Sequence, residues 1–237
     1  MSSERKTAII VGVLYIIGTI AGILSKIVSW GFLDTPDYLN TIASNASRAQ
    51  LTAFLILVMG FSLAMMPAVM FPILRRKNEA LAVGYVIFRG GLETFTYIAS
   101  AICWLSLVVV ARQYVDSGAV TATQFASHGI LLVKTIGIFD GILSIVFSLG
   151  LLMFYSALYQ ARLIPRWISG WGLIGVILYF ASGLLMMPGL ITSTTNDVLQ
   201  LPIFLQEMFL AVWLIVKGFD PSAIASLSAK TDTNEVK

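Results

Sequence analysis

Six apolar stretches, each long enough to cross a lipid bilayer as a helix, dominate this sequence of 237 residues. A membrane-spanning helix needs about 20 apolar residues, and every backbone amide at that depth must be hydrogen-bonded within the protein. The stretches therefore predict helices rather than strands, and the fold class is all-α, a polytopic bundle of six transmembrane helices. The third and fourth exceed the thickness of a bilayer and should tilt or project from it. The predicted spans are 7–30, 50–74, 80–111, 124–159, 167–187 and 201–216.

The composition excludes most other classes of protein. Hydrophobic residues make up 58% of the chain and charged residues 11%, whereas an average soluble domain is about 45–50% apolar and about 25% charged. A soluble globular enzyme, a disordered chain and a disulfide scaffold are therefore excluded. The transmembrane domain extends over residues 1–219, and the polar segment 220–237 is expected to be a mobile cytoplasmic tail with no core.

Basic residues near the span ends are distributed unequally between the two sides of the membrane. Eight lie on the side of the amino terminus and two on the other. Because cytoplasmic loops are enriched in lysine and arginine, this bias predicts that both termini are cytoplasmic and that the loops around Asp37 and Asp116 are external. The net charge of +3 therefore reflects topology, and no nucleic-acid partner is expected. The eight residues are Arg5, Lys6, Arg75, Arg76, Lys77, Arg162, Arg166 and Lys217, and the two are Arg48 and Arg112.

The sequence contains few residues for metal or nucleophilic chemistry. Cys103 is the single cysteine and His128 the single histidine, so neither a thiolate cluster nor a multi-histidine zinc site is expected. The sequence has no glycine-rich phosphate loop of the Walker type and no nucleophile elbow. We expect no cofactor and no metal, and we assign no catalytic residue.

Charged residues inside the spans are the strongest indication of a functional site. One charged side chain at bilayer depth costs about 2.5–3.5 kcal/mol on insertion scales. Such residues should therefore face the interior of the bundle and pair with one another. The charges of this set balance, and its members are Arg89, Glu93, Lys134, Asp140, Glu207 and, nearer the outer surface, Lys26.

The third span carries a polar stripe along one face. Residues four apart on a helix point in nearly the same direction, which places Arg89 and Glu93 together. Tyr85 and Tyr97 fall near the same direction. The stripe predicts that these four residues line the interior of the bundle.

A carboxylate from another helix should complete this stripe. One guanidinium can bind two carboxylates, so we expect Arg89 to contact Glu207 or, as the second choice, Asp140 within about 4 Å. Such a cluster also has a purely structural interpretation, since buried polar networks can fix helix register without binding anything.

Three short runs give the sequence a family resemblance. They are 5–12 followed by Tyr15, 89–93, and 201–207 followed by 217–219. Together they resemble the bacterial integral-membrane family known as domain of unknown function 4386, over about residues 6–219. The resemblance implies a multi-pass protein of the bacterial cytoplasmic (inner) membrane. It implies no activity, but it does imply that Arg89, Glu93 and Glu207 belong to a family pattern.

Three functions remain open from the sequence. The first is binding or transport of a small polar solute, ion or lipid headgroup, in which Glu93, Asp140 and Glu207 take up protons and Arg89 or Lys134 holds an anionic group. The second is a non-catalytic membrane assembly subunit. The third is an intramembrane enzyme that acts on lipid. The lipid bilayer is an expected partner in each case, and a homodimer remains open.

Overall fold

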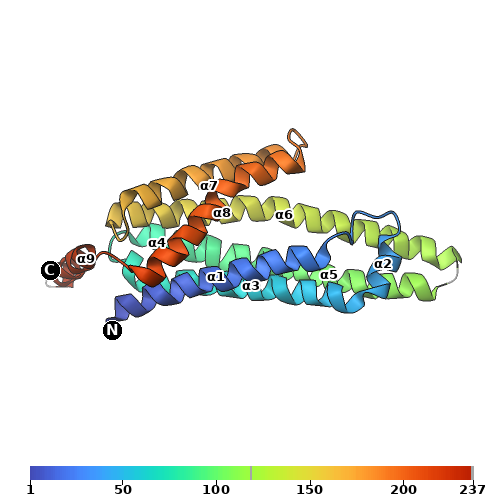
Figure 1. The fold of residues 1–237 in the computed structure, drawn as a ribbon, viewed down its shortest axis with the longest axis horizontal. Coiled ribbons are helices and arrows are strands. Elements are labelled where there is room, and N and C mark those ends of the chain that lie inside the picture. Colours follow the sequence, from blue (N-terminus) through green and yellow to red (C-terminus); the bar gives the residue numbers. More distant parts are fainter. Residues whose placement is uncertain (118, 236–237) are drawn as a thin grey trace. The chain divides into compact units, whose positions relative to one another are not determined.

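The computed structural model describes residues 1–117 and 119–235 and confirms the predicted fold class. Six helical segments are long and apolar enough to cross a membrane, and no strand occurs among the described residues. The two segments expected to exceed the bilayer have 38 and 41 residues. The elements in Figure 1 are α1 (Ser3–Ser29), α2 (Tyr38–Ser44), α3 (Ala46–Leu74), α4 (Glu79–Tyr85), η1 (Val86–Leu92), α5 (Glu93–Asp116), α6 (Ala119–Ala161), α7 (Arg166–Met186), α8 (Ser193–Val216) and α9 (Pro221–Glu235).

The chain forms two compact units. Unit 1 consists of residues 1–16, 62–94 and 143–237, and unit 2 of residues 17–61 and 95–142. Helices α1, α3, α5 and α6 contribute to both units. The elements α4, η1, α7, α8 and α9 belong to unit 1, and α2 belongs to unit 2.

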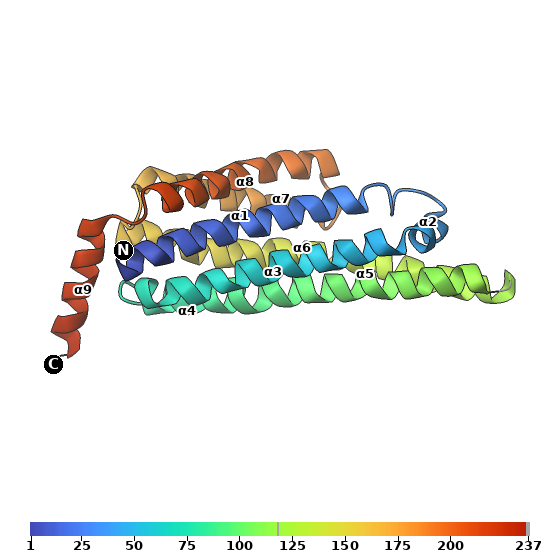
Figure 2. The ribbon, with the colours of Figure 1, turned by 60° about the horizontal axis from the view of Figure 1, so that its bottom comes forward.

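Unit 1 contains a pair of neighbouring helices and a deeply buried core. Helices α7 and α8 lie side by side (Figure 1, Figure 2). They approach closely because Gly175 of α7 has no side chain: a β-carbon there would lie 3.1 Å from the backbone nitrogen of Ile203. The core includes Tyr15, Met66 and Phe154, all with side chains excluded from solvent.

Unit 2 is held by aromatic and glycine contacts. The Phe32 ring lies 6.4 Å from that of Trp104, and the guanidinium carbon of Arg48 lies 4.8 Å from the Phe32 ring centre. Gly60 lies against Tyr97, where an added β-carbon would come within 2.9 Å of the tyrosine side chain. These contacts allow close helix packing, because small residues let membrane helices approach.

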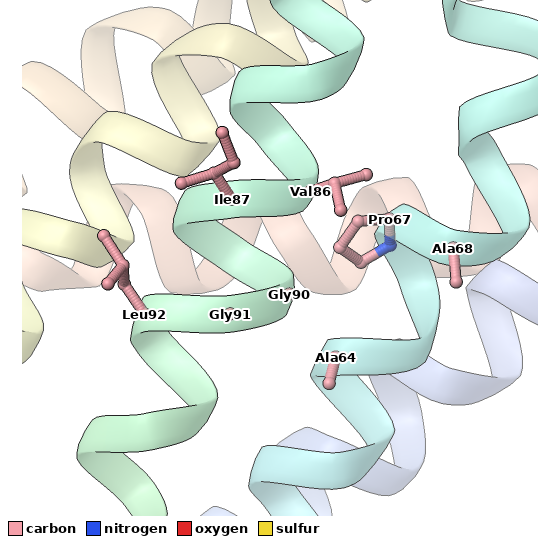
Figure 3. Close-up of a pocket in the computed structure, with 8 residues that line it drawn as sticks. All are labelled: Ala64, Pro67, Ala68, Val86, Ile87, Gly90, Gly91 and Leu92. Carbon is pink, nitrogen blue, oxygen red and sulfur yellow. The ribbon is translucent and has the colours of Figure 1, made fainter.

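One turn of the third span is a π-helix. In η1 the hydrogen bonds join residues five apart, and the backbone N–H of Glu93 donates to the carbonyl of Phe88. A π-turn of this kind is frequent at functional sites. It brings Gly90 beside Pro67 of α3, where the two helices form an apolar groove of about 550 Å³ (Figure 3). Arg89 is buried and does not line this groove.

Helix α8 begins earlier than the sequence indicated. We expected the last span to start at residue 201 with Pro202 in its first turn, but α8 starts at Ser193 and Pro202 lies inside it. The Thr192 side chain caps the helix by accepting a hydrogen bond from the backbone N–H of Thr195 at 3.2 Å. The start of α8 was not evident from the sequence, because the polar residues 193–197 interrupt the apolar run.

The segment predicted as a tail contains a helix. Helix α9 covers Pro221–Glu235, and Ala223 and Leu227 on it are buried. Arg76 donates a hydrogen bond to Ser228 at 3.3 Å, which connects α9 to the end of α3. The mobility of this segment stays a prediction.

The beginning of α1 closes the end of α8. The guanidinium of Arg5 donates to three carbonyl oxygens in the last turn of α8, those of Leu214 (3.0 Å), Ile215 (2.5 Å) and Val216 (3.2 Å). The last carbonyls of a helix have no partner within it and attract cations. Gly218 follows with a left-handed φ of 77°, and a β-carbon there would lie 2.8 Å from Arg5 Nη1. Arg5 and Gly218 both lie within the runs that carry the family resemblance. This one contact explains why an arginine and a glycine occur at these two positions.

Candidate functional site

A buried cluster of three charged side chains lies in unit 1. Arg89 comes from η1, Glu93 from the first position of α5, and Glu207 from α8. Arg89 Nη1 lies 3.1 Å from both carboxylate oxygens of Glu93, and Nη2 lies 3.3 Å from Glu207 Oε1. The predicted guanidinium-to-carboxylate contact between the third and sixth spans is confirmed, with Glu207 as the partner. We call these three residues the Arg89 cluster.

The Arg89 cluster is enclosed by aromatic rings and close backbone packing. The guanidinium carbon of Arg89 lies 4.8 Å from the centre of the Phe147 ring, within range of a cation–π contact. Tyr85 stacks on Phe154 at 4.6 Å between ring centres. Gly150 faces the backbone of Arg89, where a β-carbon would lie 3.1 Å from the Arg89 nitrogen. Arg89 is 1% exposed and Glu93 0%, whereas the Glu207 side chain is 13% exposed.

Tyrosine hydroxyls and an amide border the cluster. Tyr155 donates a hydrogen bond to Gln206 Oε1 at 2.5 Å, and Gln206 Nε2 donates to the carbonyl of Ile168 at 3.1 Å. The Tyr15 hydroxyl lies near that of Tyr155 but not in the geometry of a hydrogen bond. The hydroxyls of Tyr15 on α1 and Tyr155 on α6 therefore lie near Glu207, and Gln206 of α8 connects Tyr155 to α7.

Three buried polar atoms of the site have no hydrogen-bond partner among the described residues. They are the Tyr15 hydroxyl, the Tyr85 hydroxyl and Nε of Arg89. An unpaired buried polar group costs about 1–3 kcal/mol, and such groups are commonly satisfied by water or a ligand. The site therefore offers two hydroxyls and an N–H to a small polar partner.

The charges of the Arg89 cluster do not balance. Two carboxylates face one guanidinium, which leaves one negative charge when both carboxyl groups are ionised. An uncompensated charge is costly in a buried site. A proton or a small cation would neutralise the cluster, whereas an anion would add to the imbalance.

The other predicted site residues lie in unit 2. Tyr97 is buried, whereas Lys26, Lys134 and Asp140 are exposed. We expected these three charged residues to be paired, but none of them forms an ion pair among the described residues. Lys26 and Asp140 do interact electrostatically, although they do not come within ion-pair distance of each other.

Sequence reasoning missed several residues of the site. Phe147, Tyr155 and Gln206 all contact the Arg89 cluster or its neighbours. A signal existed for Gln206, which is an amide inside an apolar span directly before Glu207. Nothing in the sequence marked Phe147 and Tyr155, because aromatic residues in a membrane helix are common.

Comparisons with known proteins gave one match. The model of a family described as "Domain of unknown function (DUF4386)" matches residues 10–218. No curated protein and no solved structure matches the chain. The matched range contains all three residues of the Arg89 cluster.

Proposed function

The chain belongs to the DUF4386 family, whose description names no activity, and we propose from the site itself that it binds and transports a small ion or polar solute. We infer that the Arg89 cluster is the binding site and that Glu207 takes up the proton or small cation. We also place the protein in the bacterial cytoplasmic membrane, in agreement with the family resemblance and the bias in basic residues.

The observation that carries this proposal is the excess carboxylate in a buried site. Arg89 is shared by Glu93, which binds through both oxygens, and by Glu207, which contacts through one. Glu207 is thus the less completely neutralised carboxylate and also the more exposed. The groups that face it are Arg89, Glu93 and the hydroxyls of Tyr15, Tyr85 and Tyr155. These hydroxyls supply oxygen ligands for a cation or donors for a polar solute.

Intramembrane ionisable residues are expensive and mark ion and proton pathways in membrane proteins. The π-turn that carries Arg89 supports the same interpretation. A π-turn interrupts the regular hydrogen bonds between residues four apart in an α-helix. It persists only where the surrounding structure holds it in place. We expect the η1 turn to change its hydrogen bonding when Glu207 is neutralised.

Thermal unfolding in detergent tests the binding step. The parent, Glu207→Gln and the control Asp197→Asn, which removes an exposed carboxylate from the same helix, are compared across pH and in sodium, potassium and choline chloride. Saturation a hundredfold above the dissociation constant stabilises a protein by about 2.7 kcal/mol, or roughly 5–10 °C for this size. We expect such a shift in Tm for the parent and Asp197→Asn and its loss in Glu207→Gln. Equal responses of parent and Glu207→Gln would refute the proposal.

Proteoliposomes test the transport step. A pH-sensitive dye trapped inside reports proton movement when a sodium or potassium gradient is imposed. We expect flux with the parent and Asp197→Asn, and background flux with Glu207→Gln. Binding without flux in the parent would restrict the function to binding.

One observation favours the structural alternative, an assembly subunit. Arg89 and Glu93 are completely buried, and Gly150 brings the α6 backbone against Arg89. In a purely structural clamp, removal of either carboxylate destabilises the protein, and the parent shows no shift of Tm with pH or cation.

A further inference from the structure

A basic pocket lies where α6 is followed by α7 and where α8 is followed by α9, all within unit 1. Its volume is about 520 Å³, and its lining includes Arg162, Arg166 and Lys217. These three side chains are exposed, and none of them forms an ion pair among the residues that the structure describes. Among the lining residues, Asp220 alone is acidic.

The Asp220 carboxylate is engaged by α9. Its Oδ1 accepts hydrogen bonds from the Ser222 hydroxyl (2.6 Å) and from the backbone N–H groups of Ser222 (2.8 Å) and Ala223 (3.1 Å). These hydrogen bonds, that of the hydroxyl first, hold the pKa of Asp220 below its usual range. Asp220 therefore serves as the cap of α9, and the pocket retains an excess of two positive charges.

The amino-terminal end of α7 adds to the positive potential. Pro165 stands at the cap position, and its side chain accepts no hydrogen bond from the first turn. Pro165 and Arg166 both line the pocket. The first N–H groups of a helix attract anions. The competing negative end of α8 is already occupied by the Arg5 guanidinium.

The backbone at Arg162 is strained in a way that glycine would relieve. Arg162 has a φ of 56° and is the single non-glycine residue with positive φ among those described. The next two residues, Leu163 and Ile164, are buried and fix the turn. Strain of this kind persists where the side chain has a use, and here that side chain lines the pocket.

Aromatic residues place the pocket at headgroup depth. Trp213 lines it, and the Phe209 ring lies 6.3 Å from that of Trp213 and 5.3 Å from that of Trp167. Trp167 is 56% exposed. Tryptophan is enriched at the interface between hydrocarbon and water, and the pocket adjoins the ends of three spans.

We propose that this pocket binds the phosphate group of an anionic phospholipid. Basic pockets between transmembrane helices on the cytoplasmic side hold anionic headgroups, and arginine can bind a phosphate through two parallel hydrogen bonds. The acyl chains then lie along the exposed apolar surfaces of α7 and α8, which include Ile174 and Val212. This site is separate from the Arg89 cluster, and its test does not depend on Glu207.

Native mass spectrometry of the full chain in neutral detergent measures this binding. The probes are phosphatidylglycerol, phosphatidylcholine and inorganic phosphate. The test variant is Arg162→Gln/Arg166→Gln/Lys217→Gln. The matched control is Arg75→Gln/Lys77→Gln, which removes exposed basic residues near the end of α3 that do not line the pocket. We expect the test variant to bind phosphatidylglycerol about a hundredfold more weakly than the parent, and the control to match the parent.

The outcomes test separately whether the pocket binds an anion and whether that anion is a phospholipid. Preference of the parent for phosphatidylglycerol over phosphatidylcholine, lost in the test variant, supports the proposal. Displacement of the lipid by millimolar inorganic phosphate would overturn the lipid assignment in favour of a soluble phosphate. If the triple variant does not fold, Arg162→Gly serves instead, because it relieves the left-handed strain while removing one charge. Parent-like lipid affinity in every folded variant would overturn the site.

Discussion

Gly12 of α1 lies directly against Ala211 of α8: a β-carbon added to Gly12 would be 2.7 Å from the Ala211 carbonyl oxygen and equally close to the Ile215 side chain. The first and sixth spans therefore meet backbone to backbone. This contact lies between the Arg5 cap at the end of α8 and Tyr15 beside Glu207, so it sets the distance at which α1 reaches the site.

Substitution of Gly12 by alanine should destabilise the protein. The added methyl group meets a backbone oxygen that cannot move aside, and overpacking of this kind costs about 1–3 kcal/mol. Thermal unfolding in detergent provides the measurement. The control is Gly170→Ala on α7, where nothing lies within 4 Å of the new β-carbon. That variant should be neutral or more stable, since alanine favours a helix over glycine by about 1 kcal/mol. Equal Tm values for the two variants would contradict the close contact.

Glu93→Gln and Glu207→Gln should differ in their effect on stability. Glu93→Gln removes the carboxylate that binds Arg89 through both oxygens and leaves Arg89 with its single contact to Glu207, so it should cost about 1.5–3 kcal/mol, as for lost hydrogen bonds between charged groups. Glu207 is the excess carboxylate of the cluster. Residues kept for function often lower the free energy of unfolding, so their replacement can leave a protein equally or more stable. We expect Glu207→Gln to unfold no earlier than the parent. A loss of many degrees in both variants would support the structural alternative.

The orientation in the membrane can be tested with single cysteines. In a Cys103→Ala background, Ser117→Cys should react with an impermeant thiol reagent in intact cells, and Glu79→Cys should not. Glu79 is preferable to its neighbour Asn78, because the Asn78 side chain caps α4 by accepting from the N–H of Leu81. Both chosen positions lie beside the ends of the third span, 79–116. Reversed labelling would place the termini outside.

Helix α9 should lose its amino-terminal turn in acid. The Ser222 hydroxyl, followed by the backbone N–H groups of Ala223 and Ser222, lowers the pKa of Asp220. A carboxyl group with a lowered pKa stabilises the folded form above its unfolded pKa, and this contribution disappears as pH falls through the folded value. Hydrogen exchange of Ala223 and Ile224 should therefore accelerate at acid pH. Asp220→Asn, which keeps a capping oxygen without the charge, should remove the pH dependence, and a pH-dependent Asn variant would contradict this assignment.

The sequence predicted the features that arise from the cost of polarity in lipid. The six spans follow from apolar length, and the contact between Arg89 and Glu207 follows from the need to neutralise charge. The π-turn at 86–92 could not be predicted, because residues five apart carry no distinctive pattern in an apolar helix. The start of α8 was missed because a capped polar turn precedes its apolar part.

The basic pocket is a second feature that could not be predicted from the sequence. Arg162, Arg166 and Lys217 were identified from the sequence only as markers of topology. Arg162 and Lys217 are 55 positions apart in the chain, and their convergence depends on how α6, α7 and α8 pack. Hydropathy gives the ends of helices but not which ends are neighbours.

The hydrogen bonds from Arg5 to the last turn of α8 also bear on biosynthesis. Arg5 is translated about 210 residues before its three acceptors, so these hydrogen bonds can form only after α8 has been made. Until α8 is present, the Arg5 guanidinium lacks its three carbonyl acceptors, and Gly12 lacks its contact with Ala211. A nascent chain halted before α8 therefore differs at the start of α1 from a chain that contains α8.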